Sequence, residues 1–342
     1  MHDFSDFRSD TVTRPTERMK QAAMTAELGD DVMQEDPTTN RLEALAAEIT
    51  GKESALFVTS GTQANLLAMM TYCSPGDEVI MDDECHIIQH EQGGLARLAF
   101  SQARALPQKM GMMDLDAVRN AIRGDDIHYP VTRVICCENT HNRAGGVVLS
   151  LTYLKDLRSI ADEFGLKVHM DGARLFNAAV ADGIPAQKIT EHVDTVMFCL
   201  SKGLCCPIGS LLCGPKEFID KARRLRKVMG AGMRQTGFVT ALGIVALNEM
   251  VERLAEDHAR ARKLGEGIAA IRGLEVDLET VQTNMVYFRL EDGSAKQLVK
   301  KLAARKVLCF DEHGDKEIRM VTHKDIDDED VERALEALNN EV

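Results

Sequence analysis

Three segments of this sequence carry side chains of types that act in catalysis, and each lies where an apolar run ends. Lys202 follows DTVMFCLS, Asp171 ends KVHMD, and the segment SGTQAN comes directly after SALFVT. A lysine surrounded by apolar groups is favoured in its neutral form, and a neutral amine is a nucleophile that binds aldehydes. The alternative is a lysine whose ammonium group simply extends to solvent.

Asp171 and the SGTQAN segment could bind different parts of one ligand. A carboxylate in apolar surroundings needs a cation or a proton, so Asp171 could pair with Arg174 or hold a protonated ring nitrogen. Gly61 lets a ligand approach the backbone closely, and Ser60 and Thr62 add hydroxyl and N–H groups at an expected helix start, where anions bind well. An ordinary strand-to-helix turn is the alternative for this segment.

Together the three features match what pyridoxal phosphate requires of a protein. A helix start binds the phosphate, an aspartate keeps the pyridine nitrogen protonated so that the ring accepts electrons, and a lysine binds the aldehyde carbon. We therefore predict an enzyme with pyridoxal phosphate as its cofactor and without a metal.

The elements that must position these groups alternate along the first part of the chain. Short β-branched runs are expected to form strands and the runs between them helices, a pattern typical of a mostly parallel sheet with helices on both faces. Ligands of such sheets bind at the carboxyl ends of the strands, where Asp171 and Lys202 are expected. The predicted strands lie within 54–61, 77–83, 133–140, 167–171, 194–201 and 209–214, and the predicted helices at 62–73, 114–124 and 150–165.

A different pattern follows residue 215 and predicts a smaller α+β domain. A helix is expected at 216–230, one long helix from 237 to 272, short strands at 274–277, 284–290, 306–310 and 317–323, and a last helix at 328–340. The predicted division of this α/β protein is an N-terminal arm at 1–20, a large cofactor-binding domain at 21–245 and a small domain at 246–342.

The composition argues against several classes of protein. The net charge of −13 argues against a surface for nucleic acid or anionic membranes, and no apolar run approaches the length of a membrane span. The N-terminal segment MHDFSDFRSD lacks the apolar core of a signal peptide. Nine cysteines without a CxxC pair indicate reduced thiols rather than a disulfide framework. These features predict a cytoplasmic protein that acts on a small molecule.

The order of several motifs also makes the chain similar to a known family. It carries FRSDTVTRPT, GDDVMQEDPT, SGTQANLLA, ENTHN, DGARLFNA, SKGL and GAGMRQTG, which resemble motifs of the low-specificity L-threonine aldolases over residues 7–323. The resemblance implies the fold-type I architecture of aspartate aminotransferase, with a seven-stranded type of sheet. It also implies an aldehyde-lyase that cleaves L-threonine, L-allo-threonine or phenylserine into glycine and an aldehyde. A homodimer or homotetramer with sites at subunit interfaces is implied as well.

The resemblance implies residues that bind the cofactor. Lys202 would bind its aldehyde and Asp171 its pyridine nitrogen. Arg174 would bind the ring hydroxyl oxygen and lie beside the substrate carboxylate. The residues implied at the phosphate are Ser60, Gly61, Thr62 and, from a neighbouring subunit, Arg234.

The resemblance also implies residues on the substrate side. Ser9 and Arg319 would bind the substrate carboxylate, for which an arginine fork is well shaped. His86 would stack on the cofactor ring with Glu91 behind it, and His141 would lie near the β-hydroxyl. His86, His141 or a water held by them would take the hydroxyl proton, because imidazole titrates near neutral pH. The sequence does not distinguish these three.

Two stretches depart from the family. Met33 and Gln34 stand where a tyrosine and a glycine are usual, and Cys205 and Cys206 stand where small residues are usual. Both stretches are expected to line or support the site, so they leave the preferred β-substituent open.

Three other functions remain open on the sequence. A non-enzymatic scaffold is one of them, but it would leave Lys202 and Asp171 in their apolar surroundings without a purpose. A β-eliminating lyase would use the same cofactor and release ammonia with a pyruvate-type product. A metal-dependent hydrolase would use ligands such as the His169-x-Asp171 pair, or His86 with His90 and Glu91.

Overall fold

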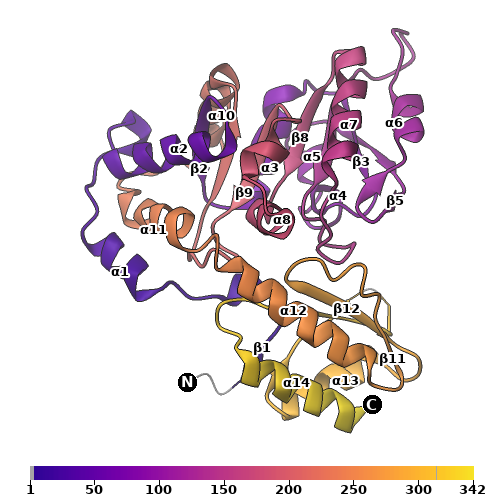
Figure 1. Cartoon of the computed structure of the whole chain (residues 1–342). Helices are drawn as coiled ribbons and strands as arrows, with labels where there is room; N and C mark the ends of the chain where they lie inside the picture. The colour runs from indigo at the N-terminus through magenta and orange to yellow at the C-terminus, as the bar shows by residue number, and fades with distance from the viewer. Residues whose placement is uncertain (1–3, 313) are drawn as a thin grey trace.

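A seven-stranded sheet forms the centre of the larger part of the chain in the computed structural model, which describes residues 4–312 and 314–342 (Figure 1). The strand order is β2 (Ser54–Val58), β10 (Ser210–Gly214), β9 (Thr195–Cys199), β8 (Lys167–Asp171), β7 (Thr132–Glu138), β3 (Glu78–Asp82) and β4 (Gln102–Leu106). Neighbouring strands run parallel except at β10, which is antiparallel to both β2 and β9. The predicted mostly parallel sheet is confirmed.

Helices cover both faces of this sheet because its strands are apolar on both sides. In β9, Val196 and Phe198 point into one core while Met197 and Cys199 point into the other, as the two-residue repeat of a strand requires. The first face carries α2 (Pro37–Thr50), α6 (Leu115–Ala121), α7 (Leu151–Phe164), α8 (Leu175–Asp182), α9 (Ala186–Thr190) and α11 (Gly237–Glu249). The second carries α3 (Gly61–Tyr72), α4 (His86–Gln89), α5 (Gly94–Arg97) and α10 (Lys216–Val228).

The helix predicted at 150–165 shows how local signals fix an element. The Ser150 hydroxyl accepts a hydrogen bond from the Tyr153 N–H at the start of α7. At its end, Gly165 adopts a φ of 67°, a conformation that glycine enters without steric cost. α7 accordingly spans Leu151–Phe164.

The C-terminal part has its own sheet and core. Its four antiparallel strands are ordered β11 (Leu274–Glu275), β12 (Met285–Leu290), β15 (Glu317–Val321) and β14 (Phe310–Asp311). The core also takes side chains from α12 (Leu254–Ala269), α13 (Ala295–Ala304) and α14 (Asp328–Glu341). These elements match the predicted α+β arrangement.

The N-terminal segment joins this C-terminal core. β1 (Ser5–Asp6) pairs in parallel with β13 (Val307–Leu308), and Phe7 is fully buried among the C-terminal apolar residues. In Figure 1 the indigo start of the chain accordingly lies beside the orange and yellow elements. The chain then passes through α1 (Glu17–Met24), which packs on α11. A short hairpin of β5 (Gln108–Lys109) and β6 (Met112–Met113) lies beyond β4.

The long helix predicted from 237 to 272 is wrong, because two helices occupy this stretch. α11 ends at Glu249 and α12 begins at Leu254, with a turn between them. Residues of α11 pack in the core around the large sheet, whereas α12 from Ala261 onward packs in the C-terminal core. The predicted domain boundary at 245 falls inside α11, and the division into domains stays a prediction.

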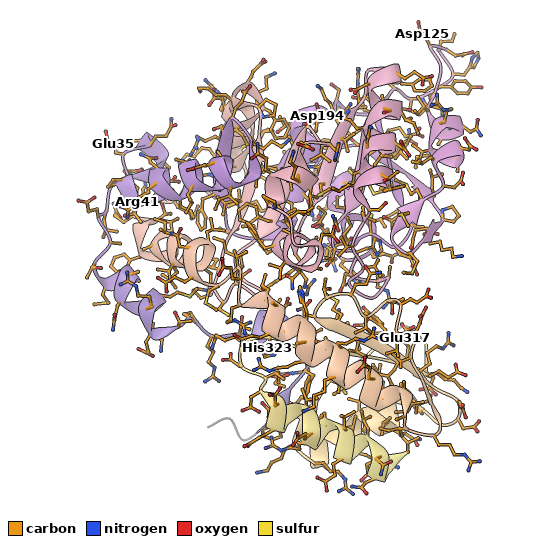
Figure 2. All side chains as sticks on the ribbon, in the orientation of Figure 1. Glu35, Arg41, Asp125, Asp194, Glu317 and His323 are labelled. Atoms are coloured by element: carbon orange, nitrogen blue, oxygen red, sulfur yellow. The ribbon has the colours of Figure 1, made fainter. Side chains whose placement is uncertain are left out.

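Polar contacts join the two parts of the chain. Arg143, in the loop after β7, forms ion pairs of 3.1 Å with Glu312 and of 3.3 Å with Glu317 of β15. His323 binds the Asp6 carbonyl at 2.8 Å where the N-terminal segment enters. Figure 2 shows His323 and Glu317 on the side of the C-terminal part that faces the large sheet. Among residues 4–312 and 314–342, no helix is both long and apolar enough to cross a membrane.

Candidate active site

The carboxyl ends of the central strands bring charged side chains to one edge of the large sheet. Asp171 ends β8 and Glu138 ends β7, and the two residues are partners in the strand register. Lys202 lies in the turn that connects β9 to β10 at the same edge. This is the edge at which open α/β sheets bind their ligands.

Asp171 is buried and held by two hydrogen bonds. Its Oδ2 accepts from the Asn65 amide at 2.7 Å, and its Oδ1 accepts from the Ala173 N–H at 3.0 Å. The sequence left Arg174 open as a partner, but the Arg174 guanidinium pairs with Asp10 instead. Asp171 therefore forms no ion pair with an arginine among the described residues, and its carboxylate faces the site with its two hydrogen bonds.

Arg174 and Asp10 form a buried two-point ion pair. The Asp10 carboxylate accepts from Nε of Arg174 at 2.8 Å and from its Nη2 at 2.7 Å. Burial alone would raise the pKa of Asp10, but the charges of Arg174 and Lys202 hold it far below its usual range. Asp10 thus brings the N-terminal segment against the two cations assigned to the cofactor.

Lys202 is half-buried in a tight turn. The Lys202 carbonyl accepts hydrogen bonds from the Cys205 N–H at 2.9 Å and from the Thr13 hydroxyl at 2.9 Å. Within the described part of the chain, the Lys202 amine makes no hydrogen bond, although it lies close enough to feel the Asp10 charge. Its backbone is fixed while its amine stays available.

The two adjacent cysteines pack beneath this turn. Cys205 and Cys206 are buried in the core around the large sheet, and Cys205 adopts a φ of 66°. Burial raises the pKa of the Cys205 thiol to about 11, and it also raises that of Cys206. The two cysteines were expected either to line the site or to support it from behind. Their buried position fits the supporting role.

The start of α3 offers free donors beside this edge. Ser60 is the N-cap, and its hydroxyl accepts from the Gln63 N–H at 3.2 Å. Among described residues, the N–H groups of Gly61 and Thr62 have no acceptor, as expected for the first turn of a helix. A Cβ at Gly61 would come within 2.8 Å of the Met197 methyl group and 3.0 Å of the Cys199 sulfur, so a larger residue here would displace the Met197 side chain.

His86 and Glu91 lie next to Asp171. The His86 Nδ1 is 2.9 Å from Glu91 Oε1, and the His86 ring is one-third exposed. Burial alone lowers the pKa of His86, but the Glu91 hydrogen bond and the Asp171 and Glu138 charges raise it overall. Ligand-type atoms of His86, Glu91 and Asp171 all lie within 4.8 Å of one another.

His141 occupies a different position. It is fully buried, its Nε2 lies 3.0 Å from Asp82, and its Nδ1 accepts from the Ala144 N–H at 3.1 Å. Burial lowers the pKa of His141, but Glu138 and Asp82 raise it to about 9, whereas the Ala144 bond favours the neutral ring. In neither protonation state is a ring nitrogen free to take a proton from substrate.

The comparisons with known proteins identify the family. A model of the beta-eliminating lyase family matches residues 6–291. Low-specificity L-threonine aldolase 1 of Arabidopsis thaliana is 44% identical over 337 residues, covering 96% of this chain and 94% of that protein. The low specificity L-threonine aldolase of Escherichia coli K12 is 43% identical over 322 residues, covering 94% of each chain. The chain belongs to the low-specificity L-threonine aldolase family.

Solved structures show the same fold at lower identity. The Leishmania major threonine aldolase matches with a TM-score of 0.84 and 20% identity over 98% of both chains. A Thermus thermophilus aspartate aminotransferase matches with a TM-score of 0.75 and 18% identity, over 99% of this chain and 92% of its own. The predicted family and fold type are therefore confirmed.

The residues implied at the substrate carboxylate lie together in this threonine aldolase family member. Arg319 donates to the Arg8 carbonyl at 3.2 Å and to the Asn142 side chain at 3.2 Å, so it lies beside the segment that holds Ser9. The Ser9 hydroxyl itself accepts from the Thr11 N–H. Both residues remain predictions as substrate ligands.

Arg234 lies elsewhere in the single chain. Its guanidinium pairs with Asp30 at 2.6 Å, and its side chain is 55% exposed. A role at the phosphate of another subunit stays a prediction. Gln34 and Met33, one of the two stretches that depart from the family, lie nearby. Gln34 adopts a φ of 59°, a left-handed conformation that favours the glycine usual at this position. Met33 is exposed.

The residues present fit pyridoxal phosphate, the cofactor on which fold-type I enzymes depend. The free N–H groups of Gly61 and Thr62 suit a phosphate. The buried Asp171 carboxylate suits a protonated pyridine nitrogen, and the Lys202 amine suits an aldehyde. His169 is not available as the metal ligand that the His169-x-Asp171 spacing suggested. Both of its ring nitrogens form hydrogen bonds, Nδ1 with Thr195 and Nε2 with Asn65.

Sequence reasoning missed three residues of this site, namely Asn65, Asp10 and Glu138. Glu138 accepts from the N–H groups of His86 at 2.7 Å and Asn142 at 2.8 Å, and so fixes two loops. A signal existed for Asn65, which lies one helical turn after Thr62 and so on the same face of α3. Nothing local marks Asp10, because its partner is 164 residues away.

Proposed function

We propose that this chain uses pyridoxal phosphate to cleave the Cα–Cβ bond of L-threonine and similar β-hydroxy-α-amino acids, releasing glycine and an aldehyde. Membership of the low-specificity threonine aldolase family makes it a carbon–carbon lyase. The observation that carries the proposal is the Lys202 amine, which makes no hydrogen bond to any described residue, at the same sheet edge as the buried Asp171 carboxylate.

Each cofactor group has a partner in this proposal. Asp171 holds the pyridine nitrogen, Arg174 lies at the ring hydroxyl, and Lys202 binds the aldehyde. Gly61 and Thr62 hold the phosphate through N–H groups that lack an acceptor in the described chain. When bound, the cofactor accepts the electrons of the broken Cα–Cβ bond.

His86 is the proposed base at the β-hydroxyl. Its Nδ1 is engaged by Glu91, which leaves Nε2 to accept the hydroxyl proton. A carboxylate bound to one nitrogen of an imidazole fixes the orientation of the ring and increases the basicity of the other nitrogen. Glu91 is in this position relative to His86. His141 is disfavoured because both of its nitrogens are engaged, and a water held by His86 would serve the same step.

Arg319 and Ser9 are proposed to bind the substrate carboxylate. The Arg319 guanidinium is oriented by hydrogen bonds from its two Nη atoms to Asn142 and to the Arg8 carbonyl, both at 3.2 Å, and its charge is paired with Glu312. A planar fork with two parallel donors suits a carboxylate. Fixing the carboxylate at one end and the amine at the cofactor leaves the β-hydroxyl pointing to one side, which is what a single base requires.

We also propose a cytoplasmic homodimer or homotetramer in which Arg234 reaches a neighbouring subunit's phosphate. Its exposure in the single chain supports this. Subunit mixing tests it: Arg234→Ala and Lys202→Ala chains, each inactive alone, should regain activity when refolded together. Mixed oligomers without any regained activity contradict a shared site.

A product assay distinguishes the proposed reaction from β-elimination, the alternative that the family description supports. The purified protein is given pyridoxal phosphate and a panel of β-hydroxy-α-amino acids, with Lys202→Ala as the matched control. Cleavage of L-threonine releases glycine and acetaldehyde in equal amounts. Release of ammonia and 2-oxobutanoate instead would establish the lyase alternative and overturn the proposal.

A further inference from the structure

A row of hydrogen-bonded side chains lies beneath Asp171, and the proposed reaction assigns no role to most of it. The Tyr72 hydroxyl donates to Thr195 Oγ1 at 3.2 Å, and this oxygen lies 2.9 Å from His169 Nδ1. The His169 Nε2 lies 3.1 Å from Asn65 Oδ1. The Asn65 amide then donates to Asp171 at 2.7 Å. The row thus ends on the carboxylate assigned to the pyridine nitrogen.

The fold places these side chains on one face of the sheet. His169 and Asp171 alternate along β8, and Thr195 is the register partner of His169 on β9. Asn65 and Tyr72 lie two turns apart on α3, which packs on the same strands. Asn65, His169 and Thr195 are buried, so the row is formed in the absence of bulk water.

The chemistry of the row gives it one direction. The Asn65 carbonyl oxygen only accepts, so the proton between the two residues lies on His169 Nε2. Burial lowers the pKa of His169 to about 4, so the ring is neutral at neutral pH and carries that one proton. Its Nδ1 must then accept from the Thr195 hydroxyl. Every donor therefore points toward Asp171.

Asn65 also connects two carboxylates. Its amide nitrogen donates to Glu91 Oε1 at 2.9 Å as well as to Asp171. Burial and the Asp171 charge raise the pKa of Glu91, and the hydrogen bonds from His86 and Asn65 oppose this. If the Asn65 side-chain amide rotated by 180°, its oxygen would face both carboxylates. The hydrogen bond from the His169 Nε2–H to Asn65 Oδ1 holds the amide in the orientation that donates to them.

We propose that Asn65, oriented by His169, is a positioning residue that keeps Asp171 and Glu91 both ionised. Two buried carboxylates this close otherwise share a proton. One amide thereby sets the charge at the pyridine nitrogen and at His86 together. The inference rests on the proposed function for the role of Asp171 and extends it to residues that touch neither cofactor nor substrate.

The Asn65→Leu variant tests the proposal through cofactor affinity. Leucine keeps the volume and removes both donors, so Asp171 and Glu91 should share a proton near neutral pH. The dissociation constant for pyridoxal phosphate, measured by equilibrium dialysis, should rise about 10- to 100-fold. It should recover as the pH rises and the shared proton leaves. Thr71→Ala, on the same helix but outside the row, is the control and should leave the constant unchanged.

A double-mutant cycle separates this role from simple loss of structure. With Glu91→Gln in place only one carboxylate remains, so Asn65→Leu should then weaken cofactor binding far less than in the native background. Equal fold-changes in both backgrounds, or a pH-independent loss, would overturn the proposal. The cycle stays informative if Asn65→Leu is less stable, since that cost appears in both backgrounds.

The apoenzyme provides a readout that needs no cofactor. Nitrogen-15 NMR should find His169 neutral and protonated at Nε2 between about pH 5 and 8. An Nδ1-protonated or freely titrating His169 contradicts the row. If the native protein binds no pyridoxal phosphate, the proposed function fails. If it binds and Asn65→Leu binds equally well at every pH, only this inference fails.

Discussion

The Asp10 carboxylate accepts two hydrogen bonds from the Arg174 guanidinium, at 2.8 Å and 2.7 Å, across 164 positions of sequence. Both side chains are buried. The Thr13 hydroxyl, three residues further on, donates to the Lys202 carbonyl at 2.9 Å. The N-terminal segment is therefore part of the candidate active site and fixes two of its cations from one side.

Replacing Asp10 tests this arrangement. Asp10→Asn leaves Arg174 buried without its counter-charge, and breaking a buried pair in this way costs about 3–5 kcal/mol of unfolding free energy. Urea unfolding at neutral pH and fixed protein concentration measures the loss. Asp6→Asn is the control in the same segment, because its pair with Arg8 is partly exposed and contributes less than about 1 kcal/mol. Equal losses in the two variants would contradict the assigned role of Asp10.

The same pair predicts how acid affects stability. The pKa of Asp10 is lowered in the folded protein, mainly by Arg174 against the effect of burial. A depressed carboxyl pKa stabilises the fold above the unfolded value of about 3.9, and this contribution is lost as the pH falls below it. Between about pH 5 and pH 3, unfolding free energy should therefore fall more steeply in the native protein than in Asp10→Asn. Parallel pH curves would show that Asp10 does not titrate with folding.

Lys202→Ala should remove both turnover and the yellow imine that borohydride traps. The amine makes no hydrogen bond in the described chain, so its loss should cost stability only through the charge removed from beside Asp10 and should leave the fold intact. Spectra, product release and thermal unfolding of the variant check this together. Normal turnover in Lys202→Ala would rule out the assigned role.

Glu91→Gln should shift the acid limb of the pH–rate profile to lower pH. The Glu91 hydrogen bond and nearby carboxylates raise the pKa of His86 against burial, so removing the charge lowers it. A base works only above its pKa, and a lower pKa extends activity toward acid. The profile of kcat against pH provides the measurement. An unmoved limb means that His86 is not the titrating base.

The two histidines should respond differently to replacement. His86→Ala removes the proposed base and should lower kcat about 100- to 10,000-fold with little change in stability. His141→Ala breaks the buried contact with Asp82 and should mainly cost stability, about 1–3 kcal/mol. Steady-state kinetics and unfolding of both variants distinguish them. A large kcat loss in a fully stable His141→Ala would reverse the assignment.

The fold was largely predictable where sequence signals are local. Ser150 and Gly165 delimit α7 as a cap and a terminating glycine. The edge strand β4 was missed because its residues, QARAL, are mostly exposed or half-buried and lack a continuous apolar run. The break between α11 and α12 was missed because it reflects a change of packing partner and not a helix-breaking residue.

The sequence by itself determined the family, the sheet, and the residue types at the strand ends. Lys202, Asp171 and Gly61 each follow a recognisable apolar run, so their positions could be found one at a time. Only the tertiary structure decided their partners, pairing Arg174 with Asp10 and Asp171 with Asn65. It also showed both nitrogens of His141 to be engaged. Hydrogen bonds between segments far apart in sequence depend on how the layers pack, and no local pattern records them.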